Sequence, residues 1–323
     1  MIGAEWKKLL RQRWLIGIAI LLIFVDVGLF LNTQYTEKKD RVAAVPLFAE
    51  YQKETADMTN EQAQEYLTDQ LNTLSNFQFV QIALNGEVDE GLLQGLVEEN
   101  PNILEEYQQA GYEEDPLALM TKIQVISELL GQYQNVSGYQ AYLESIQTQY
   151  EQMKDSSFYE GRPYAEAQGK KTTEDFAKLQ GTEPEIGMNW GVEALMEEQI
   201  SSEILILLAL GICIVLVSQD RTHDLFGLLR SCRRGHGCLI AAKFAIALTA
   251  VLFLGIIVYG SQIAIAWKLY GMGNLNRPMQ SVNELNESAR QLTVGGYLLD
   301  YYLRHLIAVL VLTAFMLCLF LSI

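Results

Sequence analysis

Residues 219–243 read QDRTHDLFGLLRSCRRGHGCLIAAK and lie between two long apolar runs. Thr222 is a candidate N-cap, and an acidic residue follows in the first turn, where a carboxylate suits the positive end of a helix. Gly235 and Gly237 come next, as glycines do just past a helix C-terminus. The spacing therefore predicts a short helix over 222–233, within a loop that joins two apolar segments.

One face of this short helix is apolar and the loop around it is basic. The apolar residues at helical spacing are Leu225, Leu228, Leu229 and Cys232, with Phe226 beside them. The basic residues are Arg221, Arg230, Arg233, Arg234 and Lys243. Because short loops rich in Lys and Arg stay on the cytoplasmic side of a membrane, residues 219–238 are predicted to be cytoplasmic. A helix there is well placed to receive force from a cytoplasmic partner.

Four apolar runs are long enough to cross a hydrocarbon layer of about 30 Å as helices. The predicted transmembrane helices cover residues 14–32, 199–218, 239–268 and 306–323. The first run is long for a signal peptide and no small-x-small cleavage site follows it, so we expect it to be retained as a span. The fold class predicted is mainly α, with polytopic membrane helices.

Residues 1–13 form a predicted cytoplasmic amphipathic helix. Ile2, Leu9 and Leu10 share one side with Trp6, whereas the basic residues fall mostly on the other. A basic amphipathic helix that carries a Trp lies well in the headgroup region of a membrane. The anchors predicted for this interface are Trp6, Lys7, Lys8 and Arg11. These bases, with Arg13, also predict a cytoplasmic N-terminus in the plasma membrane.

Residues 33–198 are predicted to form a large, mainly helical extracellular domain between the first two spans. This range holds 31 acidic and 10 basic side chains, although the whole chain has a net charge of only −16. Such an acidic domain repels nucleic acid, which is therefore not an expected partner. The domain contains no cysteine, so its stability must come from helix packing and not from disulfides.

Within this domain the sequence predicts several helices and one possible strand. Thr59 and Gln62 form a T-x-x-Q capping box at the start of a helix. The expected helices cover residues 60–75, 101–110, 116–133 and 138–154. Residues 77–84, FQFVQIAL, could form a strand by period-2 alternation, and residues 155–188 look looser. Past residue 189 a helix is expected to run without a break into the second span.

Residues 269–305 are predicted to be an extracellular loop with an interfacial helix over 294–304. Few basic residues occur in its first part, and aromatic residues flank it, as aromatic residues do at a membrane interface. The fourth predicted span then returns inward.

Two acidic residues fall inside predicted spans, Asp26 and Glu203, and both are candidates for a translocation path. An intramembrane carboxylate is unfavourable unless it faces water, a partner or the bundle interior, so it is a functional candidate. The alternative is that each reaches the interface, which is favoured for Glu203 because it lies close to the start of its span.

No enzyme site is predicted in this chain. The sequence has no complete phosphate-binding loop, GxSxG motif or HExxH motif. Cys232, His236 and Cys238, with His223 nearby, could in principle bind zinc, but C-x3-H-x-C is not a usual zinc spacing and two arginines lie between the first two ligands. No metal site and no directly bound cofactor are therefore expected.

The order of a basic amphipathic N-terminus, a span, a large outer domain, a second span and then HDLFGLLRSCRRGHGCLIAAK resembles the permease subunits of type-2 (export) ABC transporters. The residue-level match covers 1–31, 219–243 and, more loosely, 269–298. In that family the short helix is a coupling helix that docks on a separate ATP-hydrolysing subunit. The resemblance thus implies docking residues Leu225, Phe226, Leu228, Leu229, Arg230 and Arg233.

The resemblance also implies a second permease copy or a homologous permease as partner, a lipid bilayer around both, and ATP bound only by the partner subunit. Because that family usually has six spans, a chain that ends at Ile323 in an apolar run is expected to be truncated. A four-span permease of the macrolide-exporter type is an alternative. A non-transporting membrane protein whose acidic extracellular domain binds a partner is another.

Overall fold

The computed structural model describes residues 2–84, 90–109, 116–197, 200–222 and 235–322. These residues are mostly helical and include no strand, only an isolated bridge between Pro278 and Thr293. The chain divides into two compact units. The membrane unit comprises Met1–Lys38, Trp190–Met272 and Gly296–Ile323, and the helical unit comprises Lys39–Asn189 and Gly273–Gly295.

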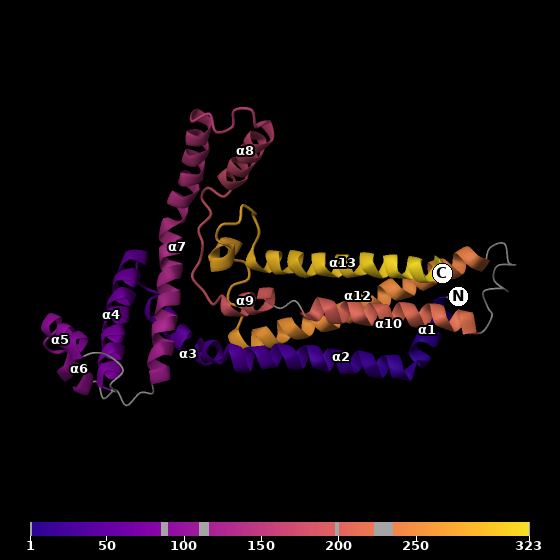
Figure 1. Ribbon diagram of the computed structural model, residues 1–323, viewed down its shortest axis with the longest axis horizontal. Coiled ribbons are helices and arrows are strands. Elements are labelled where there is room, and N and C mark those ends of the chain that lie inside the picture. The colour runs from indigo at the N-terminus through magenta and orange to yellow at the C-terminus, as the bar shows by residue number, and fades with distance from the viewer. Residues whose placement is uncertain (1, 85–89, 110–115, 198–199, 223–234, 323) are drawn as a thin grey trace. The chain divides into compact units, whose positions relative to one another are not determined.

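Four helices of the membrane unit are long and apolar enough, by length and composition, to cross a membrane. They are α2 (Arg13–Asn32), α10 (Ile200–Thr222), α12 (Gly235–Tyr270) and α13 (Val294–Ser322). They run side by side (Figure 1). The predicted mainly helical, multi-pass character is therefore confirmed.

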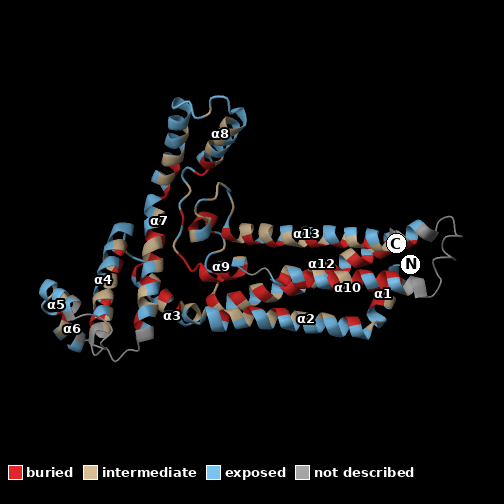
Figure 2. Ribbon diagram, viewed as in Figure 1, coloured by how far each residue is buried: buried red, intermediate tan, exposed pale blue. Residues whose placement is uncertain are grey.

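Helix α10 lies at the centre of this bundle, whereas α2 and α13 lie at its edge. In the most apolar stretch, 56% of α10 is buried but only 17% of α2 and of α13, and Figure 2 shows the same contrast. Large apolar side chains point outward from the edge helices, such as Phe24 and Val311, which are 70% and 65% exposed. Apolar surface on this scale must be covered by lipid or by protein.

A sharp break at Gln12 separates the predicted amphipathic helix from the first span. Helix α1 (Ile2–Arg11) ends just before Gln12, which leaves helical geometry with φ −81° and ψ 80°, and α2 then begins at Arg13. The Trp14 indole N–H donates to the Gln12 side-chain oxygen at 3.0 Å. The break turns α1 aside from the axis of α2 (Figure 1).

At the other end of the bundle, a π-helical turn (Thr33–Glu37) prolongs α2, and α9 (Trp190–Glu197) precedes α10. Whether α9 continues into the second span, as the sequence predicted, depends on residues 198–199, which lie outside the described residues. Residues 294–304, predicted as an interfacial helix, form the first turns of α13, which continues unbroken into the predicted fourth span. Its polar first turns and apolar later turns share one helix.

Side chains from two neighbouring helices lie against Gly255 of α12. A Cβ atom there would lie 2.6 Å from Leu306 Cδ1 of α13 and 3.3 Å from Leu205 Cδ2 of α10. Gly260, on the same helix, has nothing within 4 Å of such an atom. We therefore expect Gly255→Ala to destabilise the membrane unit by about 1–3 kcal/mol through overpacking. The matched Gly260→Ala should stabilise it by roughly 0.5–1 kcal/mol. Thermal unfolding in detergent measures both, and equal shifts would contradict this packing.

The helical unit is built around α7 (Pro116–Asp155), a single helix of 40 residues. At about 1.5 Å per residue it is roughly 60 Å long. Helices α3 (Lys39–Glu54) and α4 (Asn60–Leu84) pack along it, and α8 (Pro163–Ala177) folds back against its C-terminal half (Figure 1). The short α5 (Glu90–Glu99) and α6 (Ile103–Gln109) pack on α4.

The capping box at the start of α4 forms as predicted. The Thr59 backbone N–H donates to Gln62 Oε1 at 3.1 Å, and the Gln62 N–H donates to Thr59 Oγ1 at 3.3 Å. The possible strand at 77–84 is wrong, because these residues complete α4. Phe77 and Val80 are buried against Ile103, so the buried positions follow helical spacing and not alternation.

Two further expectations for this unit need correction. The helices expected at 116–133 and 138–154 are one helix, since Gly138 does not interrupt α7. The region expected to be loose, 155–188, contains α8, whose Phe176 packs with Tyr139 and Leu143 of α7 in a buried cluster. A glycine inside a long helix lowers its stability but does not end it when both sides are packed.

Candidate functional site: buried polar clusters

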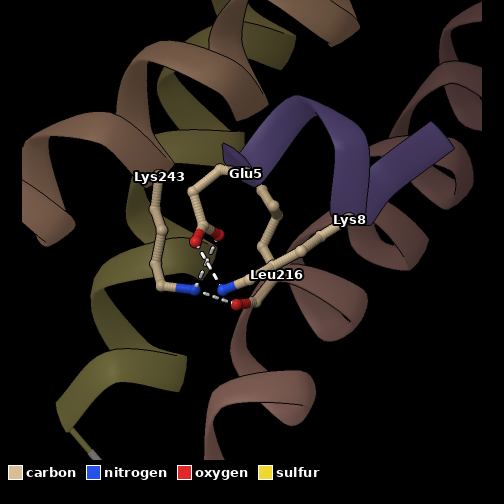
Figure 3. Close-up of polar contacts among 4 residues, drawn as sticks. All are labelled: Glu5, Lys8, Leu216 and Lys243. Carbon is tan, nitrogen blue, oxygen red and sulfur yellow. Dashed lines mark hydrogen bonds and ion pairs between the residues drawn. The ribbon is translucent and has the colours of Figure 1, made fainter. Parts of the chain in front are cut away.

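A buried ion pair joins α1 to the two helices that flank the 219–238 loop. Glu5 of α1 and Lys243 of α12 are 3% and 0% exposed, and Lys243 Nζ lies 3.5 Å from Glu5 Oε2. Lys243 also donates to the backbone carbonyl of Leu216 in α10, and Lys8 donates to Glu5 Oε1 at 2.5 Å. Figure 3 shows these four residues converging from three helices.

The position of this cluster follows from local sequence and from packing. Glu5 and Lys8 are three residues apart, so α-helical geometry places them on one face of α1. Lys243 lies two turns into α12, where its ammonium can reach the carbonyl of a neighbouring helix. A buried charge is retained only when it is paired and hydrogen-bonded, and here two ammonium groups face one carboxylate and one carbonyl.

The structure places the predicted interface anchors in different environments. Lys7 and Arg11 are exposed on α1, whereas Trp6 is half-buried and lines an apolar groove. Helical periodicity predicted that the basic residues lie mostly on the side opposite Trp6, but Glu5 draws Lys8 toward the bundle.

A second polar cluster lies near the opposite end of the bundle, around Asp26. Asp26 is 2% exposed, and Ser201 Oγ of α10 donates to its Oδ1 at 2.6 Å. Gln262 of α12 in turn donates to Ser201. The second carboxyl oxygen, Oδ2, is buried without a hydrogen-bond partner among the described residues. Asp26 therefore faces the bundle interior and joins three helices.

Glu203, the other predicted path residue, is exposed on α10, and no described contact joins it to Asp26. The polar residue next to Ser201 extends the interior cluster instead. Ser202 and Tyr259 share a hydrogen bond of 3.1 Å, and the rings of Tyr259 and Tyr302 lie 5.0 Å apart. The interior of the bundle is thus polar at this level along α10, α12 and α13.

The helical unit contains a buried arginine of its own. Arg277 is 1% exposed, and its Nη2 donates to the Met188 carbonyl at 2.8 Å and to Asn189 Oδ1 at 2.7 Å. Its Nε and Nη1 are buried without a hydrogen-bond partner among the described residues. Burial lowers the pKa of Arg277 from its ordinary value. Asn189 also donates to the Ser281 carbonyl at 3.2 Å, so the cluster ties the segment before α9 to the segment before α13.

The predicted coupling helix lies outside the described residues. This holds for all its docking residues, Leu225, Phe226, Leu228, Leu229, Arg230 and Arg233. The side chains of Cys232 and His236, considered for zinc, also lie outside them. Among the described residues, no group of three or more His, Cys, Asp or Glu side chains could hold a metal ion.

Sequence reasoning found Asp26 but missed Glu5, the buried state of Lys243, and Arg277. An acidic residue on the face of a basic amphipathic helix was the one signal for Glu5, since a membrane-surface helix has no need of it. For Lys243 the signal was its place inside the predicted span 239–268, where an ionisable side chain is unfavourable unless it is paired. Nothing local marks Arg277, which lies in a loop.

These clusters give the bundle two sets of interhelical polar ties, one at each end. Polar groups that hydrogen-bond across helices fix which helices move together.

No family model matches the chain, and no curated protein or solved structure matches it either.

Proposed function

We propose that this chain is a membrane subunit of an ATP-driven exporter of the type-2 ABC permease kind, which works with a separate cytoplasmic ATPase and a second permease. In this proposal α1 and the 219–238 loop lie on the cytoplasmic side of the plasma membrane, and the helical unit lies outside. ATP is bound and hydrolysed by the partner, and this chain moves the substrate.

The observation that carries the proposal is the buried tie among α1, α10 and α12. Leu216 and Lys243 lie on the two helices that lead into and out of the 219–238 loop, and Glu5 connects both to α1. A force applied to the loop would therefore move the amphipathic helix and both spans as one body. An ATP-driven permease requires such a link between its docking loop and its spans.

The helical unit favours this proposal over the macrolide-exporter alternative, in which the large domain is mixed α/β. In the described parts of Lys39–Asn189 and Gly273–Gly295 the regular elements are helices, with α7 as their axis. The acidic composition of this unit is equally compatible with a non-transporting protein that binds an extracellular partner. Whether an ATPase binds the 219–238 loop therefore decides between the exporter and this alternative.

In transport, the Asp26 cluster is the part of the bundle interior suited to rearrange. Its unpartnered Oδ2 is costly in a closed, dry bundle, and this penalty falls when water or a polar substrate enters between α2, α10 and α12. Closure of the ATPase subunits would push the loop, rock the tied helices and open this interior to the outside.

Co-purification with a candidate cytoplasmic ATPase that is co-expressed with this chain tests the proposal. Burying one Phe or Leu side chain is worth roughly 1.5–3 kcal/mol, so Phe226→Ala should weaken docking by about tenfold or more. Leu229→Asp, which places a charge in the same apolar face, should abolish it. Both variants should still insert in the membrane.

Phe24→Ala is the matched control, because it removes the same side chain from a lipid-facing position of α2. It should leave ATPase retention and ATP-dependent export unchanged. Undiminished retention of the ATPase by Leu229→Asp would reject the docking surface. A chain that binds no ATPase at all would reject the exporter and leave the partner-binding alternative.

A further inference from the structure

We propose that an apolar groove in the membrane unit holds one acyl chain of an anionic glycerophospholipid, whose headgroup lies against the basic residues of α1. The groove has a volume of about 310 Å³ and is formed by α1, α2, α10 and α12. This inference is independent of the proposed transport function, because it needs only a bilayer around the four helices.

The walls of the groove suit a hydrocarbon chain and nothing polar. All fourteen residues that line it are apolar, including Trp6 and Leu10 from α1 and Leu208 from α10. Two of them, Ile20 and Phe253, are 51% and 63% exposed, so the groove is open along its length. In a bilayer an open apolar groove fills with lipid chains or with another helix.

The depth of the groove matches one leaflet. Its lining on α2 runs from Leu15 to Ile23, which is about 12 Å along the helix at 1.5 Å per residue. One leaflet contributes about half of a hydrocarbon thickness of roughly 30 Å. Helix α1 provides Trp6, Leu9 and Leu10 at one end, so that end lies where a lipid headgroup lies.

Charge at the same end selects an anionic headgroup. Lys7 and Arg11 are exposed on α1, and Arg13 is exposed at the start of α2. The one acidic residue of α1, Glu5, is buried and paired with Lys8 and Lys243, so it does not offset them. Basic residues on an amphipathic helix at the membrane surface attract anionic lipid headgroups. A neutral lipid or a second protein copy in the groove would not require exposed basic residues at this end.

Native mass spectrometry of the full chain, released from nanodiscs of equimolar phosphatidylglycerol and phosphatidylcholine, tests the proposal. We expect one phosphatidylglycerol molecule to be retained per chain. Ala19→Trp, which fills the groove, should reduce retention at least tenfold, whereas Ile18→Trp, outside the groove on the same helix, should not. Thermal unfolding of both variants is the control that checks whether they remain folded.

A second variant tests the headgroup contact at exposed positions that do not disturb folding. Lys7→Gln/Arg11→Gln should lower the preference for phosphatidylglycerol by roughly 30-fold while a lipid chain is still retained. Equal retention by Ala19→Trp, or no headgroup preference in the parent protein, would overturn the proposal. So would a disulfide between Ile16→Cys residues of two copies in membranes, because a second helix would then occupy the groove.

Discussion

In Glu5→Ala, the backbone amides of α1 are expected to lose hydrogen-exchange protection by roughly a hundred- to a few-thousand-fold. Removing one partner of a buried ion pair typically costs about 3–5 kcal/mol, because the other charge remains buried without compensation. Lys243 is fully buried and still donates to the Leu216 carbonyl in this variant, but it loses the Glu5 carboxylate. Because the break at Gln12 separates α1 from α2, α1 can detach while the span stays in place, so the loss is expected there and not in the whole bundle.

Two controls separate this ion pair from general damage to α1. Lys7→Ala removes an exposed charge from the same helix and should change protection little, since an exposed ion contributes at most about 1 kcal/mol. Glu5→Met/Lys243→Met replaces both charges by apolar side chains and should recover most of the protection. Protection that is unchanged in Glu5→Ala would show that α1 is held by its apolar face alone.

Arg277→Ala is expected to destabilise the helical unit by about 3 kcal/mol. The guanidinium makes two hydrogen bonds, to the Met188 carbonyl and to Asn189 Oδ1, and bonds to a charged group contribute about 1.5–3 kcal/mol each. Release of the two unpartnered nitrogens offsets part of the loss, and the cavity left behind adds to it. Hydrogen exchange at the Gly187 amide, which donates to Gln132 Oε1, reports this change.

A double-mutant cycle between Gly187 and Arg277 tests whether the arginine itself packs against this glycine. A Cβ atom on Gly187 would overlap Arg277 Nη1. This nitrogen cannot easily move away, because Nη2 of the same guanidinium group is hydrogen-bonded to the Met188 carbonyl. Gly187→Ala should therefore cost roughly 1–3 kcal/mol in the parent protein and little in Arg277→Ala. Gly138→Ala, where nothing lies within 4 Å of the new atom, should not depend on Arg277. Additive effects for Gly187 would contradict this packing.

Elements whose stability is local were predictable from the sequence. The four spans follow from apolar length alone, and the start of α4 follows from the reciprocal bonds of Thr59 and Gln62. The amphipathic N-terminal helix was predicted for the same reason, and the structure places it at Ile2–Arg11. Each of these depends on residues within a few turns of one another.

The secondary structure of short apolar stretches was harder to predict, because the same residues suit a helix or a strand. FQFVQIAL alternates well enough for a strand, yet it forms the last turns of α4 because Phe77 and Val80 pack against Ile103. Residues 116–133 and 138–154 were predicted as two helices, although α7 runs through both and through Gly138. In both cases burial against another element outweighed a weak local preference.

The sequence by itself determined which helices are long and apolar enough to cross a membrane, which helix is amphipathic and where the acidic charge lies. Apolar length, periodicity and charge are properties of neighbouring residues. Only the tertiary structure decided that Glu5 meets Lys243, that Asp26 but not Glu203 faces the interior, and that Arg277 is buried against Met188. These contacts join residues far apart in the chain. Their existence depends on which helix faces pack together, and no local pattern encodes that choice.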